Sequence, residues 1–249
     1  MKLIGSSIVH LDNISSTNAY ILDLLKSSSP AEGLVVIADT QSAGRGLENN
    51  SWESEPGKNL TISILLYPRF LPPDKQSILS MAIALGVYDL VHSKVNSQPV
   101  SIKWPNDIYI GDRKVCGMLI QNSVLGSVFE NSVAGIGLNV NQERFLSDAP
   151  NPVSIKMVTG RESSLGETLD QLCRWLDSRY SQLRMGDRKG ITEEYLSLMY
   201  RLNEWHIYEI RGGAAEAKIV GVNQYGHLQL EERNGNRWEC DVKEVKFLL

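Results

Sequence analysis

An arginine flanked by glycines is the first feature of this sequence that could do chemistry. Arg45 lies between Gly44 and Gly46 in the polar stretch 40–52, between two strand-like runs. Glycine on both sides allows the backbone to adopt positive φ and to approach a ligand closely. Main-chain N–H groups together with one guanidinium suit a phosphate or a carboxylate. An ordinary surface loop would have the same composition, so both interpretations stay open at this point.

Other polar groups fall where a helix or strand is expected to start or end. Residues 16–18 (Ser-Thr-Asn) precede a helical apolar pattern and can either cap that helix or hold a small polar ligand group. Residues 103–107 (Lys-Trp-Pro-Asn-Asp) predict a strand and a proline turn, after which Asn106 and Asp107 can face a pocket. Lys114 heads the next apolar run and is either a solvated edge lysine or a charge aimed at an anion.

Two glycines alternate along the strand predicted within residues 127–140. Gly135 and Gly137 leave one face of that strand without side chains. A flat ligand or another stretch of backbone could lie against that face.

The elements around these residues mix strands and helices. Strands are predicted near residues 8–11, 33–38, 59–66, 100–110, 114–120 and 127–140, and helices near 17–25, 75–95, 166–185 and 192–200. From about residue 203 the pattern changes to short strands at 206–211, 216–222, 228–232 and 237–242, separated by glycine and asparagine turns. We therefore predict a main domain over 1–202 and a small C-terminal β-barrel over 203–249 that docks on it.

The bulk composition is that of an ordinary globular protein. The chain has 249 residues, of which 42% are hydrophobic and 22% charged, and its net charge is -4. An acidic balance argues against nucleic-acid binding, and no apolar run approaches a membrane helix or a signal peptide. Three scattered cysteines, Cys116, Cys173 and Cys240, fit a reducing cytoplasm and no disulfide or zinc framework.

Taken in order, these segments resemble the biotin–protein ligase family. The resemblance rests on residues 16–18, 40–46 with Trp52, 103–107, 113–117 and 135–139, and it covers nearly the whole chain. Its most specific part is Lys-Trp-Pro-Asn-Asp with the following Lys-x-x-Gly. The resemblance implies an α+β fold: a mixed sheet packed by helices, like the class II aminoacyl-tRNA synthetase core, with an SH3-like C-terminal barrel.

Members of that family activate biotin with MgATP to biotinyl-5′-adenylate, then pass biotin to a lysine of a biotin carboxyl carrier domain. The first step brings two anions together, and the resemblance implies that Arg45 and Lys114 offset their repulsion. Mg²⁺ enters with ATP, and no metal-ligating residue is assigned. Asp107 is the candidate that positions the acceptor lysine or a metal, and it is also the candidate that takes the proton of that lysine.

The resemblance also implies two sets of binding residues. The biotin set is Ser16, Thr17, Asn18, Gln41, Arg45, Gly46, Leu47, Lys114, Gly117, Gly135 and Gly137. The ATP and adenylate set is Arg45, Trp52, Asn106, Lys114 and Asn139.

The sequence departs from the family pattern in two places. Some members carry an N-terminal helix-turn-helix domain, but here the ligase pattern begins by Ser16, so we expect a short form without specific DNA binding. Many members have a basic residue directly after Gly-Arg-Gly, where this chain has Leu47 and Glu48. We expect this loop to hold the adenylate less by charge and more by packing.

Two alternatives remain beside a biotin ligase. A lipoate–protein ligase shares the fold and the chemistry, and a relative that binds the ligand without turnover would keep the pocket. The presence of both Arg45 and Lys114 argues against the second. Family members often form homodimers, and nothing in this sequence decides that point.

Overall fold

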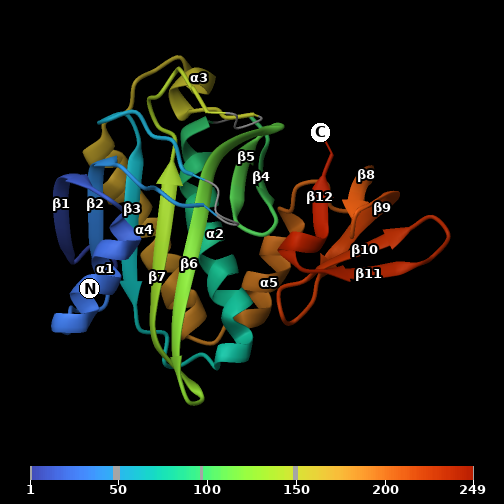
Figure 1. Cartoon of the computed structure of the whole chain (residues 1–249), viewed down its shortest axis with the longest axis horizontal. Coiled ribbons are helices and arrows are strands. Elements are labelled where there is room, and N and C mark those ends of the chain that lie inside the picture. Colours follow the sequence, from blue (N-terminus) through green and yellow to red (C-terminus); the bar gives the residue numbers. More distant parts are fainter. Residues whose placement is uncertain (1, 47–50, 96–97, 148–150, 249) are drawn as a thin grey trace.

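The computed structural model describes residues 2–46, 51–95, 98–147 and 151–248. In those residues the strands form one seven-stranded and one five-stranded sheet (Figure 1). Helices pack on the larger sheet, while the smaller sheet stands at its side. The predicted α+β class is confirmed.

The larger sheet is mixed and runs in the order β1-β2-β3-β7-β6-β5-β4. Its strands are β1 (Ser7–Ile14), β2 (Leu34–Gln41), β3 (Leu60–Leu66), β4 (Val100–Lys103), β5 (Asp107–Ile110), β6 (Arg113–Leu125) and β7 (Val128–Leu138). The pair β1 and β2 is parallel, and the other neighbours are antiparallel. As a result, β7 and β6 lie at the centre, with the predicted glycine strand between two partners.

Each face of this sheet has its own apolar core, as the alternation of strand side chains requires. On β2, Val35 belongs to the core that α2 (Gln76–Val95) and α4 (Leu165–Arg184) cover. Val36, its neighbour, belongs to the core on the other face, which α1 (Thr17–Ser27) covers. Figure 1 shows α1 in front of the sheet and the two long helices behind it.

Helix α2 is apolar almost all round because it is enclosed. The segment Pro73–Val95, which adds the 3-10 turn Pro73–Lys75, has a mean hydropathy of 1.4 and could cross a membrane by length and composition. However, 61% of the 18-residue window that has this hydropathy is buried inside the protein. It packs between the sheet and α4, which is the position of a core helix.

The last helices of the main domain begin at polar caps. Ser154 and Ser164 cap α3 (Ile155–Thr159) and α4. Helix α5 (Arg188–Ser197) begins four residues before the predicted start at 192, because the side chain of Asp187 accepts a hydrogen bond from the N–H of Gly190 at 2.9 Å. The prediction was wrong there because the apolar periodicity of α5 starts only after the cap.

The smaller sheet is antiparallel, in the order β11-β10-β9-β8-β12. Its strands are β8 (Trp205–Ile210), β9 (Gly213–Val222), β10 (Leu228–Glu232), β11 (Arg237–Cys240) and β12 (Val245–Phe247). The first four match the predicted strands within a few residues. The three-residue β12 and the 3-10 turn Val242–Glu244 before it were not predicted.

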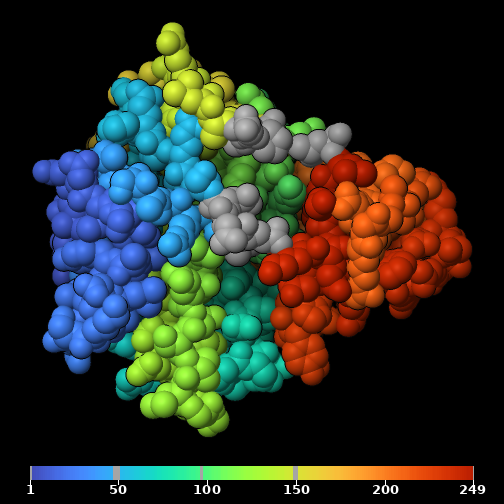
Figure 2. Space-filling model, in the orientation of Figure 1, coloured from blue at the N-terminus to red at the C-terminus, as the bar shows by residue number. Residues whose placement is uncertain are grey.

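This small sheet packs directly against the main domain, as predicted. The indole N–H of Trp104 donates to the carbonyl of Gly226 at 2.9 Å, and the hydroxyl of Ser77 donates to the carbonyl of Gln224 at 3.3 Å. The ring of Tyr200 stacks near that of Phe247, with centroids 6.5 Å apart. The space-filling view shows the orange and red C-terminal residues lying beside the rest of the chain (Figure 2).

Candidate active site

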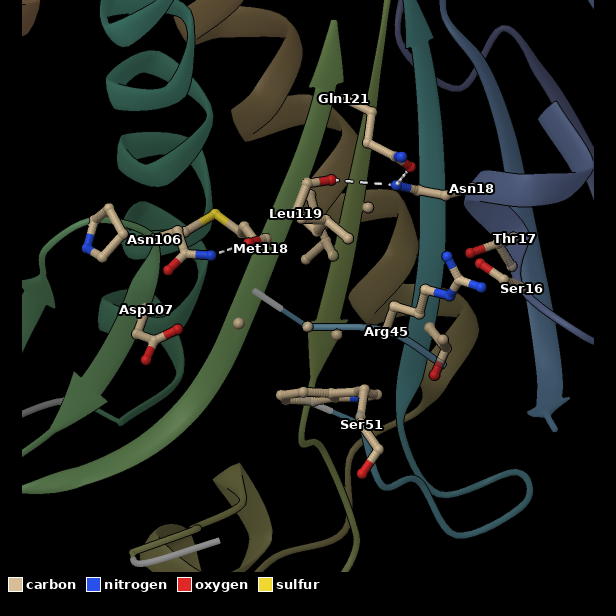
Figure 3. A pocket seen from close by; sticks show the side chains of 18 of the residues that line it. Ser16, Thr17, Asn18, Arg45, Ser51, Asn106, Asp107, Met118, Leu119 and Gln121 are labelled. Carbon is tan, nitrogen blue, oxygen red and sulfur yellow. Dashed lines mark hydrogen bonds between the residues drawn. The ribbon is translucent and has the colours of Figure 1, made fainter. Parts of the chain in front are cut away.

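A pocket of about 520 Å³ opens on the sheet face that carries α1, which is a usual size for a small-molecule site. Thirteen residues of the predicted binding and catalytic sets line it. They are Ser16, Thr17, Asn18, Gln41, Arg45, Gly46, Trp52, Asn106, Asp107, Lys114, Gly117, Gly135 and Gly137. Segments distant in sequence therefore meet at one place. In Figure 3, Asn106 and Asp107 lie at one side of the pocket, and Ser16, Thr17 and Arg45 at the other.

One row of directly paired residues crosses the sheet beneath the pocket. Pairing runs from Thr61 to Gly137, from Gly137 to Gly117, from Gly117 to Asp107, and from Asp107 to Lys103. We call these five residues the floor row. Because directly opposed residues project to the same face, the row presents one hydroxyl, two bare glycines, one carboxylate and one ammonium in that order.

The two bare positions of the floor row are covered by the indole of Trp52. A Cβ atom at Gly137 would collide with that ring, and one at Gly117 would lie 3.1 Å from it. The sequence predicted that a flat group could lie on the glycine face, and this flat group is a side chain of the chain itself. Within the described residues the buried indole Nε1 has no hydrogen-bond partner, so it can donate to a ligand.

A network of neutral hydrogen bonds forms the end of the pocket at the start of α1. Ser16 is the N-cap, and its hydroxyl accepts from the N–H of Ala19. The backbone N–H and the hydroxyl of Thr17 donate to the Gln41 side-chain oxygen at 2.7 and 3.1 Å. The hydroxyl of the fully buried Ser63 forms hydrogen bonds with two residues of α1, at 2.7 Å to the Thr17 hydroxyl and at 2.5 Å to the Asn18 amide oxygen.

Asn18 is fixed by the protein on both sides of its amide. Its Nδ2 donates to the side-chain oxygen of Gln121 at 2.9 Å and to the carbonyl of Leu119 at 3.3 Å (Figure 3). A Cβ atom at Gly135 would lie 2.5 Å from its Oδ1, so glycine is needed for Asn18 to occupy this place. Asn18 therefore holds the shape of the pocket end, while Thr17 and Gln41 face the space within it.

The charged centre of the pocket is an ion pair. Lys114 Nζ lies 2.8 Å from Asp107 Oδ1, and the two side chains are 33% and 17% exposed. The ammonium also lies 5.8 Å from the centroid of Trp52. Backbone hydrogen bonds with Asn151 and Val153 on the loop beyond β7 hold Lys114 in place. An incoming anion thus meets a cation whose charge is already shared with one carboxylate.

The turn before this ion pair is clamped to β6. The peptide bond between Trp104 and Pro105 is cis. The side-chain Nδ2 of Asn106 donates to the carbonyl of Met118, and the Met118 N–H donates to the Asn106 carbonyl at 3.0 Å. These bonds leave the Asn106 side-chain oxygen available at the pocket edge.

Arg45 lies on the exposed side of the pocket. It forms an isolated bridge with Ser51, and the Trp52 N–H donates to the Gly44 carbonyl at 3.0 Å, so the two arms of the loop pair with each other. The predicted binding residue Leu47 lies outside the described residues.

Known proteins resemble this chain in sequence and in fold. The family model for biotin/lipoate A/B protein ligases matches residues 11–139. A bifunctional ligase/repressor BirA of Bacillus spizizenii is 32% identical over 239 residues, which cover 94% of this chain and 72% of that protein. The chain belongs to the biotin/lipoate A/B protein ligase family.

Other members of the family extend the comparison. The biotin–[acetyl-CoA-carboxylase] ligase of Paracoccus denitrificans is 30% identical over 250 residues, covering 95% of this chain and 99% of that one. The biotin protein ligase of Aquifex aeolicus, solved with biotin and ATP, shares the fold with a TM-score of 0.81 at 24% identity, covering 98% and 99% of the two chains. The predicted biotin–protein ligase family is confirmed.

Asn139, a residue of the predicted ATP and adenylate set, does not line the pocket. Asn139 is 3% exposed, and its Nδ2 donates to the carbonyl of Val153 at 3.1 Å. The prediction came from the resemblance of residues 135–139 to the family motif. Strand β7 ends at Leu138, and after that point the side chain turns into the base of the following loop. The structure therefore does not bring Asn139 to the site.

Several residues that line or support the pocket were not predicted from the sequence. Ser63 and Gln121 build the polar end, Lys103 ends the floor row, and Val245 and Phe247 come from β12 of the small sheet. Ser63 had a signal, because it is a polar residue in the fully buried strand β3. The β12 residues had none that separates them from an ordinary surface strand.

Proposed function

We propose that this chain is a biotin–protein ligase that uses ATP. It joins biotin to ATP to give biotinyl-5′-adenylate and pyrophosphate, then transfers biotin to a lysine of a biotin carboxyl carrier domain. The names of relatives at 30% identity or more support the substrate, and the pocket supports the chemistry. The observation that carries the proposal is the arrangement of a neutral polar end, a glycine floor covered by the indole of Trp52, and the Lys114–Asp107 ion pair within one pocket.

Each part of the pocket suits one part of biotin. A ureido ring needs neutral donors and acceptors in pairs, and the pocket-lining cluster of Ser16, Thr17 and Gln41 offers both kinds. The indole of Trp52, which lies on the glycine floor and lines the same pocket, offers an apolar surface to the fused rings and the acyl chain. The biotin carboxylate then reaches the charged centre at Lys114.

In the first step one carboxylate oxygen of biotin attacks the α-phosphorus of ATP. Both groups are anionic, and the cations Lys114 and Arg45 reduce their repulsion. Asn106 and Trp52 are the further residues that we assign to the nucleotide. Because its ammonium is partly shielded from water and lies near Trp52, Lys114 acts in a medium that strengthens its interaction with phosphate.

We propose that Mg²⁺ enters as part of MgATP. Mg²⁺ prefers carboxylate, amide and phosphate oxygens, and the Asp107 carboxylate with the Asn106 side-chain oxygen offers the first two at the pocket edge. Within the described residues no three His, Cys, Asp or Glu side chains gather, which fits a metal held mainly by the substrate phosphates. Its chemistry there is to neutralise phosphate charge.

In the second step the neutral amine of the carrier lysine attacks the acyl carbon of the adenylate. The amine must lose a proton, and Asp107 is the carboxylate in the pocket that can take or orient it. AMP leaves with the electron pair of the broken acyl–oxygen bond. We therefore assign Asp107 to transfer, and Arg45 and Lys114 to activation.

We further propose the arrangement around this activity. Residues 1–202 form the ligase domain and 203–249 the small β module. The carrier domain is the protein partner, the site of action is the cytoplasm, and nucleic acid is not a ligand at the net charge of -4.

The test is ATP–pyrophosphate exchange with biotin, compared with lipoate. We expect exchange that depends on biotin and is at least about tenfold slower with lipoate, because a dithiolane cannot use the polar cluster at Thr17. Equal exchange with both acids would favour the lipoate ligase reading, and biotin binding without exchange would favour a relative that binds only.

A further inference from the structure

Lys103 lines the pocket, but the proposed activation and transfer steps do not use it. It is the last member of the floor row, on the edge strand β4, and its side chain lines the pocket. Its Nζ donates to the hydroxyl of Tyr109 at 3.0 Å. The same atom lies 5.0 Å from the ring centroid of Tyr109 and 4.8 Å from that of Phe247. Neutral groups from two strands, β5 and β12, therefore hold this ammonium.

The charge of Lys103 is not paired as that of Lys114 is. Within the described part of the chain no carboxylate oxygen lies within 4.0 Å of its Nζ, whereas Lys114 has Asp107 at 2.8 Å. Burial lowers the pKa of Lys103, and the carboxylate of Asp107 offsets part of this lowering. A partly buried ammonium that only a phenol and two aromatic rings contact gains strongly from an anion that enters the pocket.

The floor row sets the distance between the places where Lys103 and Lys114 act. Neighbouring strands are about 4.8 Å apart, so Lys103 begins roughly 10 Å from Gly117 along the row. The Lys114 Nζ lies beside Gly117, where an added Cβ would be 3.1 Å from it. Two phosphate groups in a chain span a few ångströms, so a polyphosphate whose α-phosphate is at Lys114 can extend across Asp107 toward Lys103.

We propose that Lys103 binds the pyrophosphate leaving group of the activation step. The inference rests on the proposed function. A biotin carboxylate oxygen forms a bond to the α-phosphorus, and the bond from that phosphorus to the oxygen bridging the β-phosphate breaks. The electron pair stays on the bridging oxygen, which leaves within pyrophosphate, and no proton is transferred. Lys103 stabilises the negative charge that develops there.

The test compares Lys103→Met and Lys103→Gln with the wild type in biotin-dependent ATP–pyrophosphate exchange. Both variants keep an unbranched stem, are one atom shorter than lysine, and remove its charge. We expect the KM for pyrophosphate to rise by about tenfold or more, with the KM for biotin changing less than about twofold. Lys103→Arg keeps the charge and is expected to remain within about threefold of the wild type. Lys189→Met, on an 85% exposed side chain of α5, is the matched control.

A second readout separates this role from a structural one. Single-turnover transfer from supplied biotinyl-5′-adenylate to the carrier needs no pyrophosphate, so we expect it to stay within about twofold in Lys103→Gln. Phe247→Leu removes an aromatic face from Lys103 and is expected to lower the melting temperature without a comparable rise in the KM for pyrophosphate.

Three outcomes overturn the proposal: an unchanged KM for pyrophosphate in both uncharged variants, an equal loss in the transfer step, or an equal effect of Phe247→Leu. A wild-type enzyme without biotin-dependent exchange would instead overturn the proposed function itself.

Discussion

The Lys114 ammonium lies 2.8 Å from the Asp107 carboxylate, and these two residues belong to different parts of the proposed reaction. Lys114 serves the phosphoryl chemistry, while Asp107 serves the amine that follows. In the described ligand-free chain each neutralises the other. Phosphate binding to Lys114 would weaken its hold on Asp107, so the carboxylate becomes available when the adenylate has formed.

Asp107→Asn is expected to separate the two steps. The amide cannot accept a proton, so single-turnover transfer from biotinyl-5′-adenylate to the carrier should fall by about 100-fold. Biotin-dependent pyrophosphate exchange should fall far less, because Lys114 keeps its charge. Asp23→Asn, on a 79% exposed side chain, is the control. An equal loss in both steps would contradict the assignment of Asp107 to transfer.

Gly137→Ala is expected to weaken biotin binding. The added methyl group collides with Trp52 and occupies the floor, and overpacking of this kind costs about 1–3 kcal/mol. Calorimetry should therefore show the Kd for biotin rising by about tenfold or more. Gly166→Ala on α4, where the nearest atom is 4.0 Å away, should bind biotin like the wild type. Unchanged binding in Gly137→Ala would show that biotin does not use this floor.

Glu53 connects the loop of Trp52 with the loop beyond β7. Its carboxylate oxygens accept from the N–H groups of Leu146 and Ser147 at 2.7 and 2.8 Å. We expect Glu53→Gln to loosen both loops, because an amide offers one acceptor oxygen in place of two. Limited proteolysis between residues 142 and 147 should become faster by a factor of about three, while the exposed control Glu193→Gln should leave it unchanged.

The same residue gives a pH dependence. Burial raises the pKa of Glu53, but the hydrogen bonds from Ser147, Leu146 and Gln142 outweigh it, so its pKa lies below the ordinary 4.5. A depressed pKa stabilises the native loop pairing above pH 4.5, and this contribution disappears as the pH falls through the native pKa. Wild-type proteolysis should therefore accelerate in acid toward the Glu53→Gln rate, with a pH-stable protease as the probe. A constant difference between the two proteins across pH 3 to 6 would contradict this link.

Tyr208 gives a prediction for alkaline stability. It is fully buried, and within the described residues its hydroxyl has no hydrogen-bond partner. Burial raises its pKa to about 12 from 10.0. The unfolded chain releases this proton near pH 10 and the native chain does not, so stability falls as the pH rises from 10 to 12.

The variant Tyr208→Phe removes this dependence. Urea unfolding should show the wild type losing roughly 1 kcal/mol more than Tyr208→Phe between pH 9 and 11. At pH 8 the variant should be at least as stable, because a buried hydroxyl without a partner costs about 1–3 kcal/mol. A marked loss of stability at pH 8 would reveal a partner for the Tyr208 hydroxyl.

The sequence predicted the residues that line the site better than the bonds that hold them. Gly135 and Gly137 could be recognised because alternation places both on one face. It could not be predicted that Trp52 would cover this face, because the loop between β2 and β3 folds back through long-range contacts. Asn139 was assigned through the resemblance of residues 135–139, and the end of β7 at Leu138 places its side chain outside the pocket lining. The part played by β12 depends on docking between sheets, which no local pattern of three residues records.

In the floor row, the two central positions contribute by having no side chain. An alanine scan measures what a side chain adds, and at Gly117 and Gly137 alanine is the larger residue. A loss of biotin binding in Gly137→Ala would therefore report an added methyl group and not a missing side chain. At these two positions the hydrogen atom that replaces a side chain is what matters. It leaves a flat surface on which the indole ring of Trp52 lies.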